Sequence, residues 1–355
     1  MAAHLSHEGP LAGAFVSVEF VGADRQCDHR HDERQEDDHH QRGHSATALP
    51  AENSGVPNPG TTEPALLLIP VHEPVTIEGY FKFMDALVRQ YDTLAPYPLS
   101  EHLLVRANAW LIDTLENTDY YRQMERGNFV FDQRKMVVLH PGDTLRLPGP
   151  RTAAALLAQM QNTRLDINVP AFRLRILEGD SVLYSYSCRV GKNTEKFLVV
   201  AGHEVDLRTR SGAGEIIRVA RQPIFYDPVT GKQFKFTKRD DGKTTRMPVI
   251  PWLEPALDGR RYGQMIHPTT NPRTLGKPAS NGCIGLREAD AWRVYYFAPV
   301  GTKVVVRYDL MEISGSGDTL RYNDVYHHLD ARKKSRAQAG VFPLPKLLND
   351  CWCEP

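Results

Sequence analysis

The stretch from Ile266 to Leu286 reads IHPTTNPRTLGKPASNGCIGL, and the rest of the chain is organised around it. It places one histidine, His267, sixteen residues before one cysteine, Cys283, and the interval is rich in proline and glycine. A thiol is a strong nucleophile only as the thiolate, and an imidazole within hydrogen-bond reach is a common way to generate that form. The stretch therefore predicts a reactive cysteine–histidine pair, although spacing alone leaves a purely structural pair open.

The two side chains cannot share a helix face, because that requires a separation of three or four residues. The chain must fold back between them, and Pro268, Gly276 and Pro278 supply residues that favour turns. Gly282 carries no side chain where a substrate carbonyl would approach the thiol. The N–H groups of Gly282 and Cys283 could then hold an oxyanion.

These residues resemble the signature of the L,D-transpeptidase family, whose catalytic domain is of the YkuD type. The family pattern runs approximately I-H-G-T, a leucine-glycine step, S-H-G-C-I-R, an Asp-Ala pair and a Gly-Thr-x-Val strand. The matching residues of this chain, in the same order, are Ile266-His267-Pro268-Thr269, Leu275-Gly276, Ser280-Asn281-Gly282-Cys283-Ile284-Gly285, Asp290-Ala291 and Gly301-Thr302-Lys303-Val304. The resemblance covers residues 164–309 and implies a mostly β catalytic domain, a β-sandwich with one or two short helices.

The resemblance further implies a peptidoglycan L,D-transpeptidase, a cysteine acyltransferase that cross-links the stem peptides of the cell wall through a thioester. Cys283 would be the nucleophile and His267 its base, with the carbonyl of Pro268 orienting the imidazole. The residues implied for the oxyanion hole and its loop are Gly282, Ser280 and Asn281. No cofactor and no metal are implied. An L,D-carboxypeptidase using the same site and a catalytically inactive peptidoglycan-binding module stay open as alternatives.

Three residues depart from the family pattern. Asn281 stands where the family has a second histidine and cannot act as a base, so proton transfer rests on His267 alone. Gly285 stands where the family has an arginine, which removes a cation that would hold a substrate carboxylate or steady the loop. Arg287, two residues on, is the predicted substitute. Pro268 replaces a glycine but keeps the carbonyl that would orient the base.

Composition narrows the classes of function. The chain has 355 residues, 41% of them hydrophobic, which is enough for two domains plus tails. Its 43 basic and 43 acidic residues balance, so no overall field favours nucleic acid or an acidic membrane. Five scattered cysteines do not describe a disulfide framework.

The resemblance implies a location in the cell envelope or periplasm, but the sequence gives this little support. The apolar run from Leu11 to Ala23 lacks a positively charged start and contains Glu19, so it is not a convincing signal peptide. No apolar run reaches the ~18 residues expected of a membrane span.

Four segments follow from the composition along the chain. Residues 1–65 hold seven of the 14 histidines, mixed with acidic residues, and are predicted to be a disordered tail and linker. A metal-binding tail is the alternative for them. Cys351 and Cys353, near the end of the chain, are weak evidence for a metal site or a disulfide. The other predicted segments are a helical module with some β structure at 66–160, the catalytic domain at 164–309 and a polar tail at 310–355.

Local patterns predict the elements of the helical module. Apolar residues recur at helical spacing over residues 74–91 and 101–117, and Ser100 is a typical N-cap for the second of these helices. A short helix is expected over residues 152–161. Residues 136–148 predict two strands joined by a Pro-Gly turn, and their end resembles a LysM-like wall-binding repeat.

The domain that follows is predicted to be rich in strands. Residues 172–177 and 182–190 alternate between apolar and polar side chains around a Gly-Asp turn, which predicts a β-hairpin. The further predicted elements are strands at 216–219, 233–236 and 303–308 and a helix at 288–297.

Overall fold

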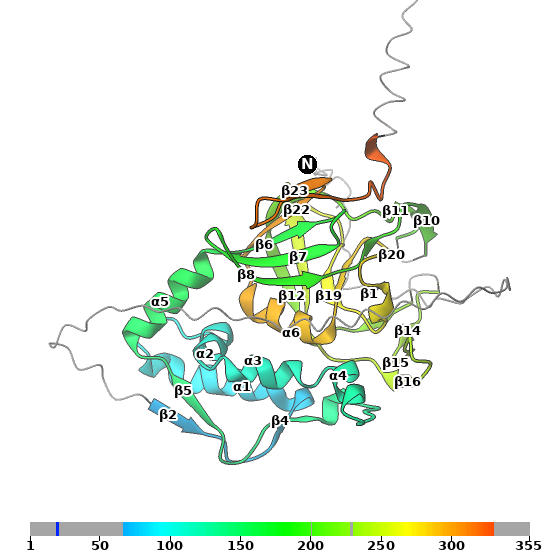
Figure 1. Cartoon of the computed structure of the whole chain (residues 1–355). Coiled ribbons are helices and arrows are strands. Elements are labelled where there is room, and N and C mark those ends of the chain that lie inside the picture. Colours follow the sequence, from blue (N-terminus) through cyan, green and yellow to red (C-terminus); the bar gives the residue numbers. More distant parts are fainter. Residues whose placement is uncertain (1–18, 21–66, 200, 228–229, 330–355) are drawn as a thin grey trace, which may run out of the picture.

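The computed structural model describes residues 19–20, 67–199, 201–227 and 230–329. Figure 1 shows two parts packed together, a helical module (residues 67–161) and a sheet domain (residues 163–307). The predicted tail at 1–65, apart from the short strand β1 (Glu19–Phe20), lies outside the described residues, as do Cys351 and Cys353. None of the helices described is long and apolar enough to cross a membrane.

One sheet forms the frame of the sheet domain. In the described part of the chain it has nine strands, in the order β21, β19, β17, β12, β22, β6, β7 and β8, with β18 pairing beside β17. The strand bounds are β6 Thr163–Asn168, β7 Arg173–Glu178, β8 Ser181–Ser187, β12 Gly212–Ala220, β17 Trp252–Leu257, β18 Arg260–Arg261, β19 Ile266–Pro268, β21 Ile284–Leu286 and β22 Lys303–Arg307.

Alternation of buried side chains explains why these segments form strands. Leu165 and Ile167 of β6 and Leu174 and Ile176 of β7 are fully buried, whereas the residues between them are partly exposed. β7 and β8 form the predicted antiparallel hairpin. Most neighbouring pairs are antiparallel, but β22 runs parallel to β6 and β19 runs parallel to β21.

Short elements lie around this sheet. The short strands are β9 Val190–Gly191, β10 Glu195–Leu198, β11 His203–Asp206, β13 Phe225–Tyr226, β14 Gln233–Phe234, β15 Phe236–Lys238, β16 Thr244–Arg246, β20 Pro278–Ser280, β23 Met311–Ile313 and β24 Thr319–Arg321. The α-helix α6 (Glu288–Phe297) has the bounds predicted from the sequence. The predicted fold class, a mostly β domain of β-sandwich type with one or two short helices after a small helical module, is confirmed.

The helical module contains five α-helices among the described residues. They are α1 Ile77–Tyr91, α2 Glu101–Ala107, α3 Trp110–Glu116, α4 Tyr120–Glu125 and α5 Pro150–Gln161. Ser100 caps α2 as predicted, since its Oγ accepts a hydrogen bond from Leu103 N at 3.1 Å.

The prediction of one continuous helix over 101–117 is wrong. The chain leaves the helical conformation at Asn108, where φ is −127° and ψ is 60°. The Asn108 side chain donates to Leu104 O and Arg146 O, both at 2.8 Å, and accepts from Arg146 N at 2.8 Å. Asn108 thus satisfies backbone groups of a distant strand, and that interaction stabilises the break.

The two strands predicted at 136–148 are present but do not pair with each other. β4 (Val137–Leu139) pairs with β3 (Val75–Thr76), and β5 (Thr144–Leu147) pairs with β2 (Leu67–Pro70). The LysM-like character of this end stays a prediction.

The helical module and the sheet domain share one hydrophobic core, and α6 lies between them (Figure 1). Trp292, Tyr295 and Tyr296 of α6 are at most 1% exposed. Tyr296 donates a hydrogen bond to the hydroxyl of Tyr80 in α1 at 2.9 Å, and the rings of Tyr80 and Trp292 meet edge to face at 6.5 Å. The helix that follows the cysteine strand is therefore held in place by the helical module.

Candidate functional site

The fold brings His267 and Cys283 to adjacent strands. His267 lies in β19 and Cys283 lies immediately before β21, which runs parallel to β19. Ile284 N donates to Met265 O at 2.8 Å, and Met265 N lies 3.4 Å from the Cys283 Sγ. The turn residues between the two strands allow the fold-back that the sequence requires.

The thiol of Cys283 is covered in this structure. Its residue is 2% exposed and packs in an apolar cluster with Phe225, Met247, Trp252 and Met265. Burial raises the pKa of Cys283, and the hydrogen bond from the Met265 N–H offsets part of that rise. The thiol is therefore protonated near neutral pH while it is covered. Cys188, the other cysteine among the described residues, is fully buried in the main core.

The imidazole of His267 is oriented but not paired to the thiol. Its Nδ1 lies 2.7 Å from the carbonyl oxygen of Pro268, the predicted orienting group. A carbonyl only accepts, so Nδ1 carries the proton and Nε2 presents a lone pair. Nε2 is buried without a hydrogen-bond partner, and the ring stacks on Trp252 with centroids 3.9 Å apart. Burial lowers the pKa of His267 to about 3.

The loop before Cys283 has a fixed shape. Ser280 Oγ donates to the carbonyl of Cys283 at 2.5 Å, and Thr209 Oγ1 donates to the carbonyl of Gly282 at 2.9 Å. Gly282 has a φ of +105°, which strongly favours glycine. Within the part of the chain that the structure describes, neither Gly282 N–H nor Cys283 N–H donates a hydrogen bond. Both donors are thus available for an oxyanion, and the half-buried Asn281 lies on the same turn.

Arg287 occupies the start of α6. Its side chain is exposed, and its charge acts on Asp290, whose pKa burial raises to about 7. Gly285 is buried in β21, where the side chain of Arg189 lies against it. The sequence pattern gave no indication of Arg189, because this residue is far from the motif in the chain.

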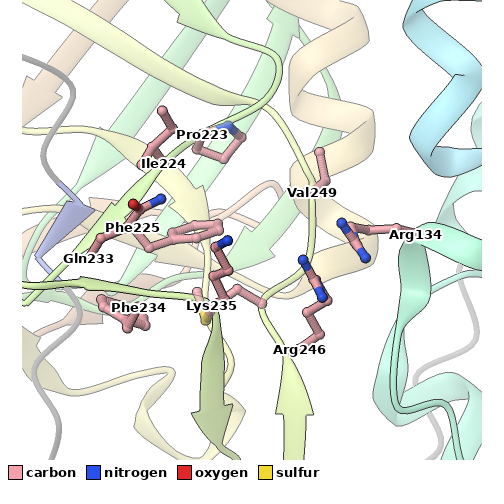
Figure 2. Close-up of a pocket in the computed structure, with 10 residues that line it drawn as sticks. Arg134, Pro223, Ile224, Phe225, Gln233, Phe234, Lys235, Arg246 and Val249 are labelled. Atoms are coloured by element: carbon pink, nitrogen blue, oxygen red, sulfur yellow. The ribbon is translucent and has the colours of Figure 1, made fainter.

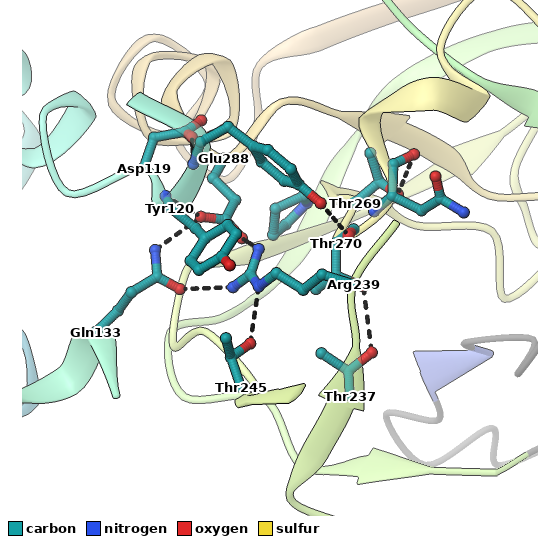
Figure 3. Close-up of polar contacts among 12 residues, drawn as sticks. Asp119, Tyr120, Gln133, Thr237, Arg239, Thr245, Thr269, Thr270 and Glu288 are labelled. Atoms are coloured by element: carbon teal, nitrogen blue, oxygen red, sulfur yellow. Dashed lines mark hydrogen bonds and ion pairs between the residues drawn. The ribbon is translucent and has the colours of Figure 1, made fainter. Parts of the chain in front are cut away.

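Sequence reasoning also missed a buried ion pair close to the motif (Figure 3). Glu288, the first residue of α6, and Arg239 are both fully buried and lie 2.6 Å apart. Glu288 also accepts from Tyr120 N at 2.9 Å and from Gln133 Nε2 at 2.7 Å. Arg239 donates in turn to Gln133 Oε1 at 2.9 Å and to Thr245 Oγ1 at 2.7 Å. The pair is well satisfied by hydrogen bonds, as a buried pair must be.

Two further contacts connect the helical module to the motif. Asp119 accepts from Ala289 N at 3.0 Å and from Tyr121 N at 2.8 Å, so one carboxylate caps both α6 and α4. The hydroxyl of Tyr121 lies 2.9 Å from Thr270 O and also contacts the carboxylate of Asp240. Thr270 is three residues after His267, so the helical module reaches the loop beside this histidine.

A cavity of about 150 Å³ lies next to the cysteine cluster (Figure 2). Phe225 and Met247 belong both to its lining and to the cluster around Cys283. The guanidinium groups of Arg134 and Arg246 point toward each other beside it, with Lys235 close by. The remaining lining residues are Pro223, Ile224, Gln233, Phe234 and Val249. This cavity therefore shares two side chains with the cluster around the thiol.

No group of three or more histidine, cysteine or acidic side chains that could hold a metal ion occurs in the described ranges.

Comparisons with known proteins agree on one family. Residues 162–306 match the family model of the L,D-transpeptidase catalytic domain. The curated relative YkuD from Bacillus licheniformis is 26% identical over 165 residues, which are 46% of this chain and 74% of that protein.

Solved structures of L,D-transpeptidases resemble the chain more weakly. The enzyme from Mycobacterium smegmatis is 16% identical with a TM-score of 0.29, and the match covers 41% of this chain and 58% of that one. The enzyme from Xylanimonas cellulosilytica is 16% identical with a TM-score of 0.29, and the match covers 71% of this chain and 100% of that one. At such scores they add no argument of their own.

The assignment rests on the family model and the curated relative. The motif residues fall inside the matched range, on β19, on β21 and in the loop between them. Residues 162–306 of this chain therefore resemble the L,D-transpeptidase catalytic domain, which is the family that the comparisons support.

Proposed function

We propose that this protein is a peptidoglycan L,D-transpeptidase in which Cys283 forms a thioester with a stem peptide. The observation that supports this most directly is the state of His267. Its Nδ1–H is directed at the Pro268 carbonyl, which leaves a buried, unpartnered Nε2 lone pair on the strand beside the thiol. An imidazole held in this tautomer is suited to accept a thiol proton.

In the first half-reaction, Nε2 of His267 accepts the Sγ proton and the thiolate attacks the carbonyl of an L-centre residue in a tetrapeptide stem. The oxyanion accepts hydrogen bonds from the N–H groups of Gly282 and Cys283. Collapse breaks the peptide bond, and the departing terminal D-amino acid takes the proton from His267. A thioester on Cys283 remains.

In the second half-reaction, the amine of another stem peptide attacks the thioester. His267 accepts a proton from that amine and returns it to the departing sulfur, so a new amide forms and the thiol is regenerated. If water attacks instead, the same site is an L,D-carboxypeptidase. The roles of Ser280 and Asn281 are to hold the loop, and Arg287 stays a predicted contact for a substrate carboxylate.

Substrate entry requires the covering side chains to move. Burial raises the pKa of Cys283 and lowers that of His267, so proton transfer between them is unfavourable in the covered state. A stem peptide that displaces Phe225 or Met247 would bring polar groups to both residues. The neighbouring cavity, lined in part by Ile224, Phe225 and Phe234, is the proposed place for an apolar part of the peptide, since Arg134 and Arg246 beside it already pair with Asp132.

The proposed substrate places the protein at the cell envelope, where stem peptides occur. Residues 66–160 and 164–309 are proposed as two units of one enzyme that pack through a common core. The departures at Asn281 and Gly285 are the features that favour the inactive binding module as the second candidate.

The test is the intact mass of the purified protein after incubation with a tetrapeptide stem. Wild type should gain the mass of the tripeptide acyl group, which is the tripeptide less one water. Neither Cys283→Ala nor His267→Gln should form this adduct. Cys188→Ala should behave as wild type, because Cys188 lies in the main core. Adding an acceptor stem should convert the adduct into cross-linked product.

Each other outcome favours a different function. Release of the D-amino acid without cross-linked product would favour the carboxypeptidase. A folded wild-type protein that forms neither adduct nor product would rule out acyl transfer and favour the binding module.

A further inference from the structure

Three backbone positions lie side by side at the edge of the sheet that carries the site. The parallel pairing of β19 and β21 sets His267 opposite Gly285. On the other side of Gly285 lies Arg189, joined to it by two hydrogen bonds, Arg189 N to Gly285 O at 2.9 Å and Gly285 N to Arg189 O at 3.0 Å. Residues directly opposite each other on neighbouring strands project to the same face. The middle one of these three positions carries no side chain.

The side chain of Arg189 fills that vacant space. A Cβ atom built on Gly285 would lie 2.5 Å from Nε, 2.7 Å from Cγ and 3.0 Å from Cδ of Arg189. These atoms are in the middle of the side chain, so Arg189 could not yield by moving its tip alone. Gly285 does not have a positive φ. Glycine is therefore needed here for space and not for backbone conformation.

The charge of Arg189 reaches both reacting groups. It favours the thiolate of Cys283 and opposes protonation of His267, lowering the pKa of each. Among the described residues, it is the charged side chain that acts on both. Its Nη1 lies 3.5 Å from the hydroxyl of Thr274, on the loop between β19 and β21. Arg287, in contrast, is exposed at the start of α6 and acts on Asp290.

We propose that Arg189 is the positioning cation of this active site, and that its guanidinium, laid across Gly285, takes the place filled in the family motif by an arginine at that position. The inference rests on the proposed role of Cys283 as nucleophile. The absence of a side chain at Gly285 leaves room for the Arg189 side chain, which enters from the neighbouring strand. The cation stabilises the thiolate as it forms and so acts through Cys283.

The first test is the pH profile of Cys283 alkylation by iodoacetamide, which is uncharged and therefore not itself drawn to a cation. Peptide mapping separates Cys283 from Cys188. Arg189→Met should shift the profile upward and slow alkylation at pH 7 by about tenfold, equivalent to one pKa unit. Arg189→Lys, which keeps the charge, should stay within about threefold of wild type. Arg260→Met, at an exposed position of β18, is the matched control and should leave the profile in place.

The second test exchanges the two residues. Gly285→Arg alone should slow alkylation, because the new side chain collides with Arg189. Combining it with Arg189→Gly should restore the wild-type profile, since the cation then enters from position 285. The exchange variant lacks the Arg189 side chain but keeps a cation. Its recovery would show that slow alkylation in Arg189→Met comes from the missing charge and not from misfolding.

An unchanged profile in folded Arg189→Met, an equal shift in Arg260→Met, or an exchange variant that stays slow would each overturn the inference. Alkylation needs no stem peptide. A chain that shows the Arg189-dependent profile but forms no acyl adduct would therefore refute the proposed function while the cation's effect on the thiol stands.

Discussion

Two contacts of different kinds orient the imidazole of His267. The Pro268 carbonyl fixes the tautomer, and the face of Trp252 supports the ring at 3.9 Å. The negative face of an indole ring stabilises a cation above it. Burial and Arg189 act in the opposite direction and keep the ring neutral at rest. The base is thus hard to protonate when covered, and the indole ring supports the imidazolium once it forms.

The pH dependence of stability should report this neutral state. The pKa of His267 is about 3 in the folded chain and ~6.5 when unfolded, so the unfolded chain binds more protons as the pH falls below ~6.5. The stabilisation that the neutral His267 contributes is complete above that pH and is lost as the pH falls toward 3. His267→Gln should reduce the loss of stability between pH 7.5 and 4.5, measured by urea unfolding, by roughly 2–3 kcal/mol.

His102 offers a matched control, since burial lowers its pKa to about 4. His102→Gln should also reduce the loss of stability at acid pH, but it should leave the rate of Cys283 alkylation unchanged. Equal acid sensitivity of wild type and His267→Gln would contradict a buried neutral imidazole.

Among the elements, the segment between β12 and β17 contributes Phe225 and Met247 to the cluster around the thiol. This covering segment, residues 221–249 with 228 and 229 outside the described residues, includes β13 to β16. It is attached to the helical module at both ends, where Arg221 pairs with Asp85 at 2.7 Å and Arg246 lies 3.9 Å from Asp132. Between these attachments, Phe225 packs on Trp252 at 6.1 Å and covers the cysteine cluster.

Phe225→Ala should therefore open a path from the cavity to Cys283. We expect alkylation of Cys283 at pH 8 to become at least about tenfold faster, because solvent access both admits the reagent and reduces the desolvation that raises the thiol pKa. Cys188 in the same sample is the internal standard and should stay slow. An unchanged ratio of the two rates would mean that Phe225 does not cover the thiol.

For the whole molecule, the buried ion pair of Arg239 and Glu288 in the sheet domain is linked to the helical module through Tyr120 and Gln133. Glu288→Gln should destabilise the protein by roughly 3–5 kcal/mol, because it leaves a buried guanidinium without its counter-charge. Adding Arg239→Met should recover part of this loss. Urea unfolding at pH 7 measures both variants. A loss below about 1 kcal/mol in Glu288→Gln would show that the buried pair contributes little to the stability of the protein.

The sequence predicted what is encoded locally. Cys283 and His267 stand out because the motif and its turn residues are contiguous, and α2 begins where Ser100 predicts it. The break at Asn108 was not predictable, because its cause is a hydrogen bond to a strand 38 residues away. Arg189 was missed for the same reason, since only the pairing of distant strands sets it against Gly285.

The core shared through α6 also constrains how the chain can fold during synthesis. A ribosome makes α1 first, yet the partner of Tyr80 is Tyr296, which is 216 residues later. Until α6 emerges, Tyr80 and Phe81 of α1 lack their aromatic partners Trp292, Tyr295 and Tyr296, so the nascent helical module is vulnerable to proteases and to aggregation. Limited proteolysis of stalled nascent chains should show protection of the module only after residue 297 has left the exit tunnel. Protection of shorter chains would mean that the module folds by itself.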